Sequence, residues 1–476
     1  MAASSPMGGV QMTQQSIAEL REEIRQDPRL LEDYLTLLRF PTVSADPQRA
    51  EDLIRCARWL EARLQQIGLE VLWIETPGAP LLLAQSKQDP KLPTLLIYNH
   101  YDVQPVDPLS AWDHPPFDPL IREGVVYARG AQDNKGQLAY VLAALRTMLQ
   151  QGDLPCNIKW IIEGEEEHGS AGLAAVLSDL GPLIQADDCL IVDGSVHDLK
   201  HPAVDVRARG IVSGTLTLTG SKSDMHSGAL GGLAYNPLRA LCEVISSLWD
   251  DKGRVTIPGF YDNVEEWSDE QKAMVHAHAA TAGLEELLGL EFHGGEKDLP
   301  PWERVWLRPT LEINGLSGGH SGPGHKTVIP AVAEAKITCR LVAGQDPRRI
   351  AQRLKDTFES MHIPGMKLRW EPGHGGHPLV GNPEGVLTEA ARAAYEEVFG
   401  APCGLAMTGG SYPVCADLVR VAGAGVLSIG LGLPTDQIHA PNEHFDVDRL
   451  TWGVVLIQRV LQQYGERQSI RRVASR

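Results

Sequence analysis

Short apolar runs that lead directly into histidine and carboxylate side chains are the feature that most restricts how this chain folds. Three such runs are residues 94–98 before His100 and Asp102, residues 125–127 before Asp133, and residues 158–162 before Glu166 and Glu167. Apolar runs of this length are typical of buried strands. Because the loops that follow parallel strands meet at one edge of a sheet, we expect these polar side chains to share one site.

The order of the predicted elements indicates the fold class. Helical spacing from Ser16 to Leu69, broken at Asp27 and Pro28, is followed by strands that alternate with helices as far as residues 189–192. Such alternation is typical of an α/β fold in which helices cover both faces of a mostly parallel sheet. The alternation returns after Pro378 and closes with a helix over 450–464.

The middle of the chain has a different pattern, with alternating strands that have one exposed face. These strands are expected at 211–220 and 333–342, with helices at 237–249 and 352–361 and a helical or looped lid segment over 254–307. We therefore predict an inserted α+β domain. The predicted division assigns 1–207 and 378–476 to the two parts of the α/β domain and 208–377 to the insertion.

Charge and cysteine content exclude several classes of protein. The chain has 61 acidic and 43 basic residues, a net charge of −18, which argues against a nucleic-acid or anionic-membrane partner. No apolar run approaches the roughly 20 residues of a membrane span, and the N-terminus lacks the features of a signal peptide. The seven cysteines are scattered without a CxxC pair, which is typical of reduced, buried thiols. We therefore predict a cytoplasmic protein.

Two further side chains complete a set of candidate metal ligands. Asp193 ends an apolar run, and His439 lies in segment 437–443 after another strand-like run. Zinc, manganese and cobalt all accept imidazole nitrogen and carboxylate oxygen. Two metals about 3.5–4 Å apart need a carboxylate shared between them. The predicted ligands of such a pair are His100, Asp133, Glu167, Asp193 and His439.

The residues beside these ligands have a chemical use as well. When two glutamates are adjacent, one can bind metal while the other acts as a general base, so Glu166 is the candidate base beside Glu167. Asp102 can accept the hydrogen bond from the second ring nitrogen of His100 and so select the ligating tautomer. Taken alone, the acidic turn 163–167 would be typical of a solvated surface.

Eight motifs, spread in order over most of the chain, carry a family resemblance. They are YNHYDVQP (98–105), WDHPPF (112–117), YARGAQDNKG (127–136), EGEEEHGS (163–170), SDMHSG (223–228), KTVIP (326–330), GGSYP (409–413) and HAPNE (439–443). With these motifs the chain resembles the M20 family of co-catalytic metallopeptidases, and within it the cytosolic non-specific and carnosine-type dipeptidases. The resemblance implies a zinc-peptidase-like catalytic domain with an inserted dimerisation lid, and hence a homodimer.

The resemblance also implies a role for each candidate residue. One metal would be held by His100 and Asp193 and the other by Glu167 and His439, with Asp133 as the bridge and a cis peptide between Asp133 and Asn134. Glu166 would deprotonate the water activated by two divalent ions, zinc or manganese with cobalt also acceptable, and Asp102 would orient His100. From the lid, His226 would reach the partner subunit's site to stabilise the oxyanion, Thr327 would contact substrate there, and Arg340 and Ser411 would bind the substrate, Arg340 at its terminal carboxylate. For His374 and His377 two alternatives stay open: one of them lines the substrate site, or both lie on the surface.

Hydrolysis of dipeptides or short peptides with a free carboxyl end is therefore the predicted function. The same metal core would also suit an N-acyl-amino-acid amidohydrolase of the deacetylase or desuccinylase type. A non-catalytic protein that keeps the fold is a third reading, and the presence of Glu166 and all five ligands argues against it. The sequence does not choose the metal or the preferred side chains of the substrate.

Overall fold

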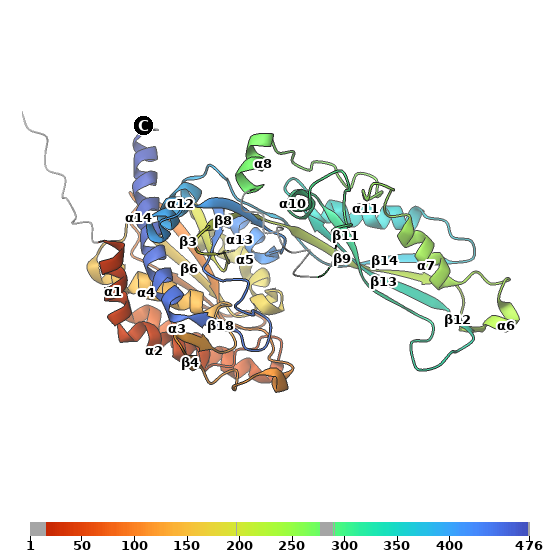
Figure 1. Ribbon diagram of the computed structural model, residues 1–476, viewed down its shortest axis with the longest axis horizontal. Helices are drawn as coiled ribbons and strands as arrows, with labels where there is room; N and C mark the ends of the chain where they lie inside the picture. The colour runs from red at the N-terminus through yellow and green to blue at the C-terminus, as the bar shows by residue number, and fades with distance from the viewer. Residues whose placement is uncertain (1–15, 197, 277–288, 290, 475–476) are drawn as a thin grey trace, which may run out of the picture.

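The chain folds into two bodies that lie side by side along the long axis of the molecule (Figure 1). This computed structural model describes residues 16–196, 198–276, 289 and 291–474. The larger body contains both ends of the described chain, and the smaller one is built from its middle. No helix in these described ranges has the length and apolar character needed to cross a membrane.

A sheet of nine strands, counted over the described residues, forms the centre of the larger body. Its strands, in spatial order, are β1 (Glu70–Ile74), β2 (Leu81–Gln85), β6 (Asn157–Glu163), β3 (Thr94–His100), β7 (Asp188–Val192), β17 (Gly425–Ile429), β8 (Ala203–Ala208) and β15 (Leu379–Val380), with β16 (Gly404–Thr408) also paired to β8. The four central strands β6, β3, β7 and β17 run parallel to one another. The predicted mostly parallel sheet is therefore confirmed.

Alternate residues of the central strands pack into two different cores, because successive side chains of a strand point to opposite faces. In β3, Leu95 and Ile97 belong to one buried cluster, whereas Leu96 and Tyr98 belong to the other. The first cluster is covered by α1 (Ile17–Gln26), α2 (Pro28–Leu38), α3 (Ala50–Gln66), α4 (Lys135–Gln151), α12 (Val386–Phe399) and α14 (Val447–Ala474). The second is covered by α5 (Ala171–Ile184) and α13 (Pro413–Ala422). Both faces are thus buried, as the alternation of strands and helices predicts.

The first helices begin where the sequence signals predict. Ser16 caps α1 by accepting from the backbone N–H of Glu19, whose side chain accepts from the N–H of Ser16 in return. Asp27 then caps α2, with Pro28 as its first residue, so the predicted break at this pair is confirmed. α14 extends ten residues beyond the predicted end at Tyr464.

The smaller body is a four-stranded antiparallel sheet with its own core. Its strands, in order, are β11 (Thr310–Gly318), β13 (Val332–Leu341), β9 (Gly210–Thr219) and β14 (Lys367–Gly376), and α7 (Pro237–Ser246) and α11 (Pro347–Ser360) pack on one face. The predicted α+β character of this region is confirmed. β11 and β14 were not predicted from the sequence. Most residues of β14 are exposed, and its buried positions do not alternate.

Residues 125–127 form a strand as predicted, but their predicted place in the parallel sheet is wrong. They form β5 (Val125–Tyr127), which lies outside the large sheet and pairs with β4 (Leu120–Arg122) and β18 (His444–Asp446) in a separate antiparallel sheet. β4 and β5 are joined by Glu123 and Gly124, which both have positive φ, at 54° and 80°. Such a two-residue turn forms a tight hairpin. A three-residue apolar run does not distinguish such a hairpin from a parallel strand.

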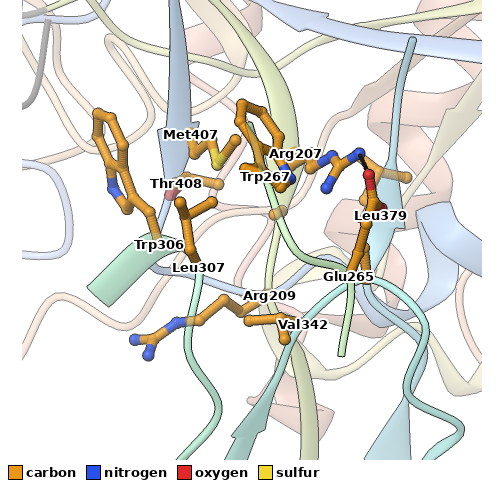
Figure 2. Close-up of a pocket in the computed structure, with 12 residues that line it drawn as sticks. Arg207, Arg209, Glu265, Trp267, Trp306, Leu307, Val342, Leu379, Met407 and Thr408 are labelled. Carbon is orange, nitrogen blue, oxygen red and sulfur yellow. Dashed lines mark hydrogen bonds and ion pairs between the residues drawn. The ribbon is translucent and has the colours of Figure 1, made fainter. Parts of the chain in front are cut away.

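The segment between the predicted helices of the smaller body reaches back to the large sheet. It includes α8 (Asp269–His276), which contacts β16, and α10 (Pro301–Trp306); part of the predicted lid segment, 277–288 and 290, lies outside the described residues. Arg207 of β8 forms a 3.0 Å ion pair with Glu265 and lies 4.6 Å above the ring of Trp267. Figure 2 shows these three side chains lining a pocket where the two bodies meet.

A small ladder lies at the far end of the smaller body (Figure 1). It pairs β10 (Met225–His226) with β12 (Val328–Ile329), and the short helix α6 (Ser227–Leu230) follows β10. Leu230 and Leu233 are exposed at this end, Leu233 with 83% of its surface accessible. Leu233 is the most exposed large apolar side chain among the described residues.

Removing buried volume from α11 should destabilise the smaller body first. Leu354 is fully buried in that core, so Leu354→Ala is expected to lower the free energy of unfolding by about 2–5 kcal/mol. Lys355→Ala, an exposed neighbour on the same helix, should change it by less than about 0.5 kcal/mol. Urea denaturation measures the loss, and hydrogen exchange locates it. Equal loss of protection in the large sheet would show that the two cores unfold as one.

Candidate active site

Three neighbouring parallel strands deliver the first side chains of the site. His100 is the last residue of β3, Asp193 directly follows β7, and the pair Glu166 and Glu167 follows β6. Because β6, β3 and β7 are adjacent and parallel, their carboxyl ends lie together. The sequence prediction that these residues share one edge of the sheet is confirmed.

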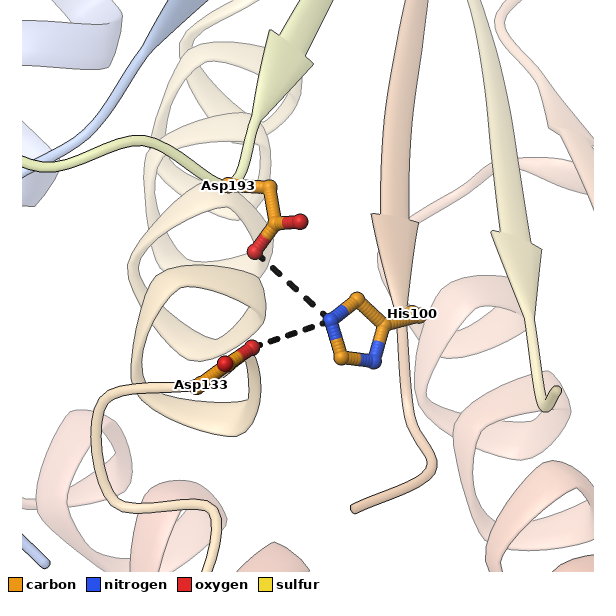
Figure 3. Close-up of side chains that lie close together, drawn as sticks. All are labelled: His100, Asp133 and Asp193. Atoms are coloured by element: carbon orange, nitrogen blue, oxygen red, sulfur yellow. Dashed lines mark hydrogen bonds and ion pairs between the residues drawn. The ribbon is translucent and has the colours of Figure 1, made fainter. Parts of the chain in front are cut away.

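Asp133 lies between the two histidines of the site. One of its carboxylate oxygens is 3.1 Å from Nε2 of His100, and the other is 3.0 Å from Nε2 of His439. The same His100 nitrogen is 3.6 Å from Asp193, as Figure 3 shows, and the His439 nitrogen is 3.2 Å from Glu167. Asp133 thus belongs to both groups of side chains.

Asp102 holds three parts of the site together. Nδ1 of His100 lies 3.2 Å from both its carboxylate and its backbone carbonyl oxygen, which leaves Nε2 facing the other ligands. The same carboxylate accepts from the backbone N–H groups of Glu166 and Glu167, at 3.2 and 3.0 Å, and from the hydroxyl of Ser44. The predicted pairing with His100 is present, and the link to the acidic turn was not predicted.

The loop that carries Asp133 is shaped around the fully buried carboxylate of Glu443. This carboxylate accepts from the guanidinium of Arg129 at 2.8 Å and from the backbone N–H groups of Gly130, Gln132 and Asp133, at 2.8–3.1 Å. Glu443 comes from the segment that also carries His439. One buried anion therefore fixes the loops of two ligands to each other, and the Asp133–Asn134 peptide in this loop is cis.

The carboxylates of the site repel one another in their buried setting. Burial raises the pKa of Glu166 well above its usual value, and Asp193 and Glu167 add to the shift against the opposing charge of His100. Burial and the charge of Asp133 raise the pKa of Glu167 to about 7, and burial raises the pKa of Asp193. Like charges close together disfavour ionisation, so bound cations would favour the ionised form of these groups.

The histidines act in the opposite direction on Asp133. Burial disfavours its ionisation, but hydrogen bonds from His100 and His439 outweigh burial and lower its pKa. In return, hydrogen bonds to Asp133 and Glu167 raise the pKa of His439 to about 10. The metal-free site therefore holds protons where ligand lone pairs are needed.

The donor set fits two divalent cations. Among the described residues, His100, Asp133 and Asp193 form one group whose ligand atoms all lie within 4.8 Å of one another, and Asp133, Glu167 and His439 form a second. All donors are imidazole nitrogens or carboxylate oxygens, which suit zinc, manganese and cobalt alike. The shared Asp133 is the arrangement that a two-metal site requires.

The structure places the predicted lid residues in two different positions. Nη1 of Arg340 donates to Oγ of Ser411 at 2.5 Å, which joins the smaller body to the larger one. His226 and Thr327 lie instead at the distant ladder, where the backbone N–H of Ser227 donates to the carbonyl of Thr327 (Figure 1). Within one chain these two residues are therefore not brought to the metal ligands.

Two residues that the sequence analysis did not select also contact the ligands. Nε2 of Gln104 donates to the carboxylate of Glu167 at 2.8 Å, and Nδ2 of Asn134 donates to that of Asp193 at 2.6 Å. Both residues lie within the motifs that carry the family resemblance, so their place in the sequence could have marked them as candidates. The sequence does not indicate which ligand each side chain contacts. His374 is exposed on β14, and its Nδ1 lies 3.1 Å from the hydroxyl of Ser213.

The family was identified by comparison with known proteins. The model of peptidase family M20/M25/M40 matches residues 96–463, which include all five candidate ligands. The chain belongs to peptidase family M20. It is accordingly an enzyme that acts on peptide bonds, and the resemblance on which the sequence prediction rested is confirmed.

Relatives and solved structures agree with this assignment. The chain is 28% identical over 435 residues to Cys-Gly metallodipeptidase of Schizosaccharomyces pombe, covering 87% of this chain and 91% of that protein. It is 29% identical over 427 residues to Beta-Ala-His dipeptidase of Rattus norvegicus, covering 84% and 85%. Its fold is similar to that of an M20 family metallo-carboxypeptidase from Sulfolobus solfataricus, with a TM-score of 0.82 and 30% identity over 92% of this chain and 99% of that one. The predicted fold class is confirmed.

Metal binding should release a proton from His439. Its pKa of about 10 means that the imidazole is protonated in the metal-free protein at pH 8, whereas a ligating imidazole is neutral. Because the pKa is raised, this release is expected below pH 10 and disappears as the pH rises through that value. Calorimetric titration with Mn²⁺ in buffers of different ionisation enthalpy counts the protons.

The variant His439→Gln should release about one proton fewer than the wild type. His293→Gln is the matched control, because His293 is exposed and, among the described residues, its ring forms an ion pair with Glu291. An unchanged proton count in His439→Gln would contradict the assignment of His439 as a ligand.

Proposed function

We propose that this enzyme hydrolyses dipeptides or short peptides with a free carboxyl end, using two divalent ions per subunit. The observation that carries the proposal is the position of Asp133, which belongs to both ligand groups. His100 and Asp193 would complete one ion site, and Glu167 and His439 the other. Zinc and manganese are the expected ions, with cobalt also acceptable.

Glu166 is proposed as the general base. When bound, the two cations polarise the scissile carbonyl and lower the pKa of a water molecule. Glu166 is held beside the ligands by the hydrogen bond of its backbone N–H to Asp102, at 3.2 Å. Its carboxylate takes a proton from the attacking water and returns it to the leaving amine. A pKa raised by burial suits this exchange, because the proton must leave as readily as it arrives.

Arg340 is proposed to bind the terminal carboxylate of the substrate, and Ser411 is proposed as another substrate contact. Arg340 is half-buried, and its Nη1 donates to the hydroxyl of Ser411. A guanidinium in such a position can bind a carboxylate through two parallel hydrogen bonds. The similarity to a Cys-Gly metallodipeptidase and a Beta-Ala-His dipeptidase favours peptides over N-acyl amino acids as substrates.

We propose further that residues 208–377 form a lid domain through which the enzyme dimerises, with 1–207 and 378–476 as the catalytic domain. His226 is exposed, and its Nδ1 accepts from the backbone N–H of Gly228 at 3.0 Å. Nε2 therefore carries the proton and can donate to an oxyanion in a partner subunit. Thr327 lies beside it at the same end.

The seven free cysteines suit a cytoplasmic location.

Loss of the general base should abolish turnover. With a dipeptide panel and metal-loaded protein, Glu166→Gln is expected to lower kcat by about 10²–10⁴-fold with little change in metal content. His293→Gln serves as the control and should keep wild-type activity. A chelator should abolish activity and Mn²⁺ or Zn²⁺ should restore it. Cleavage of N-acyl amino acids in place of every dipeptide would overturn the substrate assignment and leave the metal site standing.

Two inactive variants should complement each other if His226 acts across the dimer. In a mixed dimer, the His226→Ala subunit keeps Glu166 and receives the intact His226 of the Glu166→Gln subunit. Random exchange of subunits would then restore about a quarter of wild-type activity, because half of the dimers are mixed and each has one working site. Mixing Glu166→Gln with His439→Gln should restore none. The absence of recovery in the first mixture, despite exchange, would contradict the shared site.

A further inference from the structure

Three buried polar side chains form a continuous chain of hydrogen bonds beneath the ligand Asp193. The indole N–H of Trp160 donates to Oδ1 of Asn99 at 3.0 Å, and Nδ2 of Asn99 donates to Oδ1 of Asn134 at 2.6 Å. Nδ2 of Asn134 then donates to the carboxylate of Asp193 at 2.6 Å. Trp160, Asn99 and Asn134 have no exposed surface.

The direction of this chain is fixed by the groups at its two ends. An indole N–H can only donate, so it faces the amide oxygen of Asn99 and turns the amide nitrogen toward Asn134. The backbone carbonyl of Val192 can only accept, and it accepts from both Asn99 and Asn134, at 2.7 and 2.9 Å. Both amide nitrogens therefore point toward β7 and Asp193. Reversal of either amide would place its nitrogen against another donor and its oxygen against acceptors, in a site closed to water.

We propose that the Trp160–Asn99–Asn134 chain is a positioning device that orients Asp193 and thereby sets the metal affinity of the His100–Asp193 half of the site. This inference rests on the proposed two-metal function. The hydrogen bond from Asn134 occupies one carboxylate oxygen of Asp193 and limits its rotation. Asn134 also directly follows Asp133, but the side-chain hydrogen bond of the chain goes to Asp193, whereas the backbone N–H of Asp133 donates to Glu443.

The other half of the site is held by different contacts. Glu167 accepts from Gln104 at 2.8 Å, and its backbone N–H donates to Asp102. Neither contact involves the buried amides. A change in the Trp160–Asn99–Asn134 chain is therefore expected to weaken one of the two bound ions and leave the other in place, whereas a general loss of packing would affect both.

Trp160→Phe tests this inference because it removes the N–H and keeps an aromatic ring in the core. Metal-free protein is titrated with Mn²⁺ in a calorimeter, with chelator competition for the tighter site. One of the two dissociation constants should rise by about tenfold or more, the size typical of lost contacts to a metal ligand. Kinetics at saturating Mn²⁺ should then recover most of kcat, because the site refills.

Tyr464→Phe is the matched control. Tyr464 is also fully buried, and its hydroxyl donates to Asp188 at the opposite end of β7, at 2.9 Å. It should lower stability to a similar degree and leave both dissociation constants unchanged. If Tyr464→Phe weakens metal binding as much as Trp160→Phe does, the effect is one of stability and the inference is overturned.

A double-mutant cycle separates a connected chain from independent packing losses. Asn99→Ala interrupts the same chain, so the double variant with Trp160→Phe should bind the weakened ion no worse than Asn99→Ala alone. Additive losses, or two unchanged dissociation constants in Trp160→Phe, would overturn the inference. A wild-type protein that binds a single ion would instead contradict the proposed two-metal function, which keeps the two failures distinct.

Discussion

The carboxylate of Asp133 lies between the imidazoles of His100 and His439, and the other ligand side chains are arranged around these two contacts. It is mostly buried, with 14% of its side-chain surface exposed, and lies beside other carboxylates that repel it, so it requires strong positioning. Glu443 supplies this by accepting three backbone N–H groups of the Asp133 loop, and Arg129 balances the charge of Glu443. The result is a rigid loop on which two ligand groups can share one residue.

The strands determine the rest of the site through their direction. β3, β6 and β7 are parallel neighbours, so His100, the acidic turn and Asp193 emerge at the same edge. Asp102 then connects His100 to the backbone of the acidic turn, which keeps Glu166 beside the ligands. The smaller body contributes through Arg340, whose hydrogen bond to Ser411 joins the two bodies close to where a substrate carboxylate is expected.

Much of this arrangement could be predicted because it follows from local pattern. The apolar runs at 94–98 and 158–162 identify buried strands, and each is followed by ligands, so strand order alone brings them together. The run at 125–127 misled the same reasoning, since three residues and a Glu123–Gly124 turn make a hairpin outside the large sheet. Asp133 reaches the site all the same, through a loop that Glu443 shapes from more than 300 residues away.

The sequence by itself determined the fold class, the residue types of the metal site and the family, because periodicity and motif order are properties of the chain. Only the tertiary structure decided which side chains support those ligands. Trp160, Asn99 and Asn134 lie far apart in sequence, and nothing in their spacing indicates that their polar groups meet beneath Asp193. The distance of His226 from the ligands of its own chain is likewise a tertiary property. Buried polar groups must find partners wherever packing closes them off from water, and packing depends on the whole fold.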